Sequence, residues 1–80
     1  MAVPAFCAVT VVITEINGIE LTEPIPVLEG VLFPEVGGFV TFPVLGVPLT
    51  IPCPSEDLEQ TIAVNGTLFT LLINAEPVVA

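Results

Sequence analysis

Residues 13–22 read ITEINGIELT and place an Asn-Gly dipeptide between two runs of apolar and β-branched residues. Asn17 and Gly18 both tolerate positive φ, which a two-residue hairpin turn requires at its two central positions. Gly37-Gly38 and Asn65-Gly66 are placed in the same way, each between apolar runs. The sequence therefore predicts three β-hairpins.

The apolar runs between the turn signals divide the chain into short strands. We expect seven, over residues 5–16, 19–27, 30–36, 39–45, 47–52, 59–64 and 67–74. Seven strands in 80 residues predict an all-β fold, a small single-domain β-sandwich or barrel that covers residues 1–80. Ser55 to Glu59 is the one segment with the pattern of a helical turn, with Ser55 as its N-cap, and we expect one turn at most. Residues 76–80 are predicted to form a short tail.

Prolines are concentrated in the middle of the chain, where they cannot donate hydrogen bonds to a strand ladder. We therefore expect the middle strands to be short, bulged or at sheet edges. The residues concerned are Pro24, Pro26, Pro34, Pro43, Pro48, Pro52 and Pro54. Residues 36–55 are uncharged and long enough to span a bilayer, but their prolines and glycines rule out a membrane-spanning helix.

The N-terminal run from Ala2 to Ile13 is apolar at nearly every position, so both faces of this strand require cover. One arrangement makes it a central strand of its own sheet. The other, which we favour, makes residues 1–13 an arm that is exchanged into a neighbouring subunit by strand addition. The residues assigned to this assembly arm are Ala5, Phe6, Val9, Val11 and Ile13.

Two cysteines, Cys7 in the arm and Cys53 between two prolines, are disulfide candidates. They allow one intrachain bridge, an intersubunit cross-link if the arm leaves its own body, or two buried free thiols. Metal binding is not expected, because two thiolates without histidine make an incomplete site.

Charge and composition exclude whole classes of function. The chain has nine acidic residues, no Lys, Arg or His, and a formal net charge of −9. Nucleic-acid binding is excluded because it needs cations to displace counterions from phosphates. The chain also lacks imidazole, amine, guanidinium and phenol groups, so we expect neither an enzyme nor a cofactor.

Five acidic residues are weak calcium candidates, and calcium is the one cation we consider as a cofactor. Two of them, in the first hairpin, are predicted to face each other, which is unfavourable unless both are solvated or share a cation. The other three follow Pro54, without the glycine and ligand spacing of a calcium loop. The candidates are Glu15, Glu20, Glu56, Asp57 and Glu59.

The preferred function is a structural protein, a self-assembling subunit of a durable filament, tube or coat that is extracellular or at a cell, spore or virion surface. Its partner is itself, through β-strand exchange. High apolar content (54%), an apolar C-terminus and the absence of every trypsin cleavage site support this role. The alternatives are a small binding or adhesion module for a sugar, a cation or a protein, or a virion component. A binding module is weakened because Trp, Tyr and Arg are absent.

Overall fold

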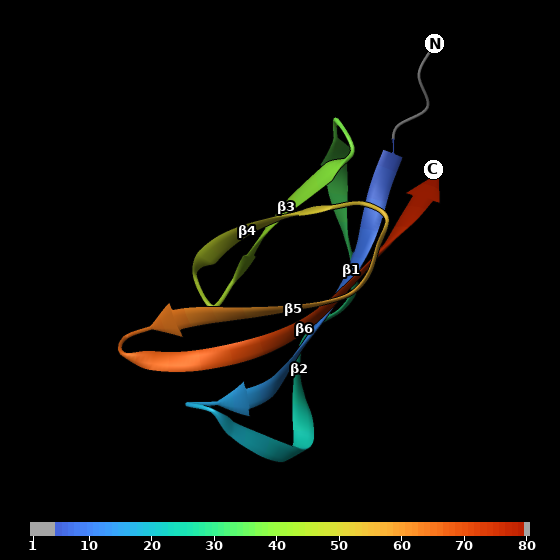
Figure 1. The fold of residues 1–80 in the computed structure, drawn as a ribbon. Helices are drawn as coiled ribbons and strands as arrows, with labels where there is room; N and C mark the ends of the chain where they lie inside the picture. Colours follow the sequence, from blue (N-terminus) through green and yellow to red (C-terminus); the bar gives the residue numbers. More distant parts are fainter. Residues whose placement is uncertain (1–4, 80) are drawn as a thin grey trace.

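The computed structural model describes residues 5–79, which fold into one all-β domain. Six antiparallel strands form a nearly closed barrel in the order β4-β3-β2-β1-β6-β5 (Figure 1). The strands are β1 (Ala5–Ile16), β2 (Ile19–Val36), β3 (Phe39–Val44), β4 (Val47–Pro52), β5 (Ser55–Val64) and β6 (Thr67–Val79). The predicted all-β class is confirmed, and of the two expected architectures, sandwich or barrel, the structure has the barrel.

All three predicted hairpin turns are confirmed. Asn17 and Asn65 adopt φ values of 53° and 50°, and the glycines of all three dipeptides also have positive φ. A fourth two-residue turn, at Leu45 and Gly46, joins β3 to β4, where only a strand boundary was expected. In that turn Leu45 adopts a φ of 52°, a conformation that costs a branched side chain more than Asn or Gly.

The strand count is six because predicted strands 19–27 and 30–36 are one strand, β2. Gly30, with a φ of 59°, lies in a region where the β1–β2 register shifts, so a bulge keeps the two halves in one ladder. The predicted helical turn at residues 55–59 is wrong, because these residues begin β5 and pair with β6. The predicted tail is also wrong as far as Val79, which ends β6. Within residues 5–79, no helix could cross a membrane.

Strand β1 lies in the middle of its own sheet. It pairs with β2 on one side and with β6 on the other, from Ala5 to Ile16. Residues 5–13 of the predicted arm therefore form part of a central strand of their own sheet, which is the other arrangement that the sequence allowed. Residues 1–4 of the arm lie outside the described residues. Exchange between copies is not tested by a single chain and stays a prediction.

The core lies between the sheet β2-β1-β6-β5 and the β3–β4 hairpin. The sheet contributes eight buried residues: Cys7, Val9, Val11, Ile13, Ile62, Leu71, Ile73 and Ala75. The hairpin contributes four: Val40, Phe42, Val44 and Ile51. Phe33 of β2 packs on Phe42, with ring centroids 5.7 Å apart. Because β3 pairs with β2 only at Glu35 and Val36, this apolar packing holds the hairpin against the sheet.

Candidate functional site

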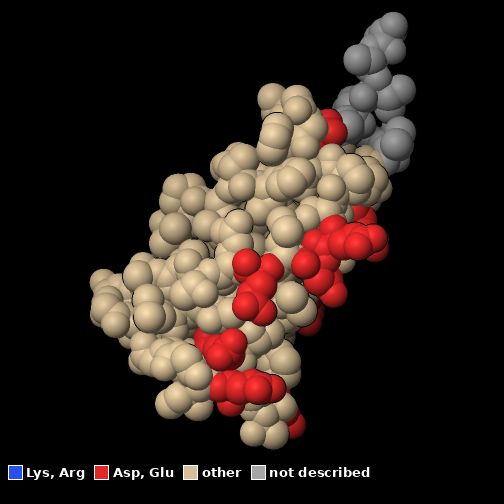
Figure 2. All heavy atoms as spheres, in the orientation of Figure 1, with Lys and Arg blue, Asp and Glu red and all other residues tan. Residues whose placement is uncertain are grey.

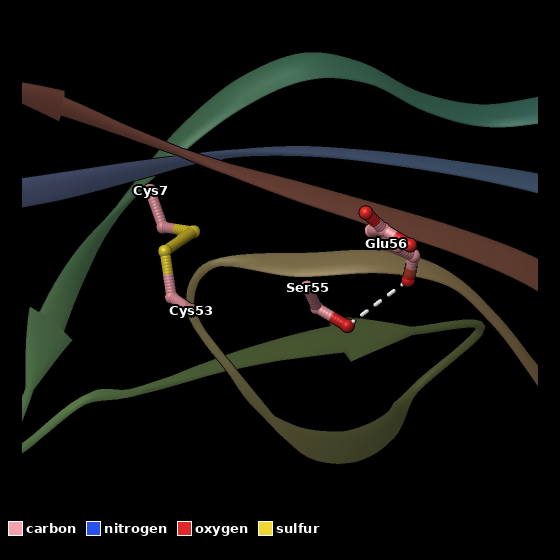
Figure 3. Close-up of a disulfide and its surroundings, with 4 residues drawn as sticks. All are labelled: Cys7, Cys53, Ser55 and Glu56. Atoms are coloured by element: carbon pink, nitrogen blue, oxygen red, sulfur yellow. Dashed lines mark hydrogen bonds between the residues drawn. A yellow bond between two sulfur atoms is a disulfide. The ribbon is translucent and has the colours of Figure 1, made fainter.

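One end of the molecule is fastened by a disulfide between Cys7 of β1 and Cys53 of the β4–β5 linker (Figure 3). Their Cα atoms are 6.5 Å apart, and both residues are buried. The Cys53 amide also donates to the Gly38 carbonyl oxygen at 2.9 Å, and the Cys53–Pro54 peptide is cis. Of the three arrangements that the sequence allowed, the structure has the intrachain bridge. A buried disulfide indicates an oxidising environment.

A shallow pocket of about 280 Å³ lies beside this linker, between the start of β5 and the end of β6. Its polar groups come from Ser55, Glu56, Asn74 and Glu76. The Ser55 hydroxyl donates to the Glu56 carbonyl oxygen at 3.0 Å (Figure 3), so it has no general base as a partner. The pocket therefore offers hydrogen-bonding groups and negative charge without an activated nucleophile.

The acidic side chains form a band along one side of the molecule (Figure 2). Glu15 and Glu20 are register partners in the β1–β2 hairpin, as predicted. On β5, the Asp57 carboxylate accepts a hydrogen bond of 3.2 Å from the Asn74 side-chain amide. Across residues 5–79, however, no three acidic, cysteine or histidine side chains converge in a metal-binding arrangement.

The five calcium candidates are therefore divided between two places. Glu15 and Glu20 belong to the β1–β2 hairpin, whereas Glu56, Asp57 and Glu59 belong to the first half of β5. A calcium ion takes six to eight oxygen ligands, which neither group supplies by itself. The described residues favour the reading of a solvated acidic face.

Three of the assembly-arm residues belong to the core of their own chain. Val9 and Val11 are fully buried and Ile13 nearly so, all on the inward face of β1. Phe6 is half-buried, and Ala5 is the first residue of the strand. In this structure the strand that carries these residues pairs with its own β2 and β6, and their insertion into a neighbouring subunit stays a prediction.

The sheet has edges without a hydrogen-bonded partner strand. In the sequence, only the prolines indicated such edges. β4 and β5 end the strand order and are not hydrogen-bonded to each other. β2 has no described partner over residues 19–34 on the side away from β1, because β3 joins it only at its end. β2 also carries five exposed large apolar side chains: Ile19, Ile25, Val31, Leu32 and Val36.

Comparison with protein-family models, with curated proteins and with solved structures found no match to this chain. No residue role is therefore carried over from a relative. The features with functional content are the unpaired edges, the disulfide and the acidic band.

Proposed function

We propose that this protein is a structural subunit that assembles with copies of itself outside the cytoplasm, in a filament, tube or coat at a cell, spore or virion surface. The observation that carries the proposal is the unclosed barrel, whose end strands β4 and β5 each have a hydrogen-bonded partner on one side only. Unpaired N–H and C=O groups at a sheet edge are a template for a strand of another chain.

The disulfide and the composition support an extracellular setting. A domain of 80 residues buries a limited core, and a cross-link is a common way to stabilise such a domain in an oxidising compartment. The absence of Lys and Arg also removes every cleavage site of trypsin-like proteases. Both features favour a protein that has to persist outside a cell.

Edge-to-edge contact fits the geometry better than exchange of β1. Exchange would break the pairing of β1 with β2 and β6 in its own chain. It would also carry Cys7 away from its own Cys53, so that each bridge would link two chains. Pairing through an open edge keeps the buried core and the disulfide as they are.

The test is sedimentation velocity and negative-stain microscopy of the oxidised full chain over a wide range of concentration. The proposal predicts assemblies that grow with concentration. Non-reducing denaturing gels of the same material distinguish the two routes, because edge contact leaves single chains and exchange leaves disulfide-linked oligomers. Monomers at every concentration would overturn the proposal and favour a binding module.

A further inference from the structure

Between Gln60 and Val64, the backbone of β5 presents two residues to its open edge. The two-residue turn at Asn65-Gly66 makes Val64 and Thr67 a hydrogen-bonded pair, and pair types alternate along an antiparallel ladder. Ile62 therefore bonds to β6, whereas the N–H and C=O groups of Thr61 and Ala63 point away from it. The hydroxyl oxygens of Thr61 and Thr70 lie 3.4 Å apart, which agrees with the closer side chains of a non-hydrogen-bonded pair.

The open edge of β4 is blocked by proline at two of its three outward positions. The turn after Val44 makes Val44 and Val47 a hydrogen-bonded pair. By the same alternation, the backbone groups of Pro48, Thr50 and Pro52 point away from β3, toward the open edge. Proline has no N–H to offer, and such residues are a common protection of an edge strand. β4 therefore presents one outward amide.

The open edge of β2 is protected along its whole length. Three prolines and three glutamates are spread between residues 19 and 34: Pro24, Pro26, Pro34, Glu20, Glu23 and Glu29. Any second strand would meet a missing donor or a carboxylate within a few residues. The second half of β5, from Gln60 to Val64, contains neither proline nor charge.

Charge selects the direction in which two copies of β5 can pair. The acids of β5 all lie in its first half, at Glu56, Asp57 and Glu59, and the chain has no cation to neutralise them. Parallel pairing would align these acids side by side, which is unfavourable. Antiparallel pairing centred on Ile62 sends the two acidic halves to opposite ends and places Glu59 opposite Asn65 of the second copy.

We propose that two copies of this chain join through their β5 edges as an antiparallel pair, with the two-fold axis at Ile62 and with Thr61 and Ala63 exchanging backbone hydrogen bonds across the joint. This inference rests on the proposed self-assembly. Ile62 lies opposite its equivalent in the second copy, and because its side chain is only 8% exposed in the single chain, backbone pairing supplies most of the contact. A two-fold contact closes a dimer, and growth of a filament then uses a separate surface.

The test compares the wild-type chain with Ala63→Pro and with the matched control Ala63→Val. Proline removes the outward N–H of residue 63 but none of the bonds that Ile62 and Val64 make to β6, whereas valine keeps that N–H. Sedimentation velocity on the oxidised chains should show that Ala63→Pro raises the dimer Kd roughly ten- to a hundredfold, because each copy loses one donor. The control should dimerise like the wild type.

Ala63→Glu provides a second variant in case the proline variant does not fold, since it keeps the N–H and adds a carboxylate at the joint. Circular dichroism establishes that each variant is folded. If the wild type assembles and folded Ala63→Pro and Ala63→Glu assemble equally well, the β5 contact is wrong and self-assembly stands. If the wild type is monomeric throughout, both are wrong.

Discussion

Reduction of the Cys7–Cys53 bridge should remove a large part of the stability of this domain. The cysteines are 46 residues apart in sequence, and closing a loop of that length in the unfolded chain corresponds to about 4 kcal/mol in the chain-entropy model. Domains of this size are stable by only about 4–12 kcal/mol. The loop contains β2, β3 and β4 entirely, so the β3–β4 hairpin should loosen first.

Urea unfolding of the oxidised chain, the reduced chain and the double variant Cys7→Ala, Cys53→Ala measures this effect. With an m value of roughly 1–3 kcal/mol/M, a loss of about 4 kcal/mol should lower the urea midpoint by roughly 1.3–4 M on reduction. The double variant should resemble the reduced chain, because both lack the cross-link. A loss of less than about 1 kcal/mol on reduction would refute the reasoning, since the bridge would then not constrain the unfolded chain.

Three further outcomes are expected. Leu71→Ala, at a fully buried position, should lower the free energy of unfolding by about 2–5 kcal/mol. Leu68→Ala, at a position 48% exposed, should change the free energy of unfolding by less than about 1 kcal/mol. Thermal melts of the two variants check this contrast. Asn17→Ala should cost about 1–3 kcal/mol, because it removes the 2.9 Å hydrogen bond from the Leu68 amide to the Asn17 side chain and strains a positive φ. Asn17→Gly should cost less, and equal losses in chemical denaturation would rule out the strain contribution. Raising the salt concentration from about 0.01 M to about 0.15 M should strengthen self-assembly, because it shortens the Debye length from about 30 Å to about 8 Å. Salt then screens the repulsion between subunits that each carry a formal net charge of −9. Weaker assembly at the higher salt concentration, measured by light scattering, would argue against repulsion between subunits.

Local turn chemistry is the part of the fold that the sequence predicts best. Asn17-Gly18, Gly37-Gly38 and Asn65-Gly66 act through their own backbone preferences, so no distant contact was needed to locate the hairpins. The prolines likewise predicted edges, because a missing N–H excludes a residue from a ladder wherever the partner lies. Pro48 and Pro52 indeed lie on an end strand.

The errors arose where a distant strand overrides a local signal. Ser55, Glu56 and Asp57 have the composition of a helix start, but pairing of this segment with β6 extends it into β5. The predicted strands ended at residue 27 and began again at residue 30, yet pairing with β1 carries β2 through this region, with a bulge near Gly30.

The candidate site depended on arrangement in space, which residue types alone do not determine. The apolar pattern of residues 5–13 predicted cover on both faces, but only one face of β1, that of Val9 and Val11, is buried in the core. On the other face Ala8 and Val12 are half-buried and Thr10 is exposed, while β2 and β6 satisfy the two edges of the strand. The pairing of Cys7 with Cys53 within one chain likewise depended on a fold that brings β1 next to the β4–β5 linker.

Association through the β5 edge can be measured by amide hydrogen exchange along this strand. In the single chain, the amides of Gln60, Ile62 and Val64 bond to β6, whereas those of Thr61 and Ala63 face the open edge. We expect the amides of Thr61 and Ala63 to exchange rapidly in dilute samples and to become protected as concentration rises, while the other three amides are protected throughout. Rapid exchange of Thr61 and Ala63 in fully assembled material would contradict association through this edge.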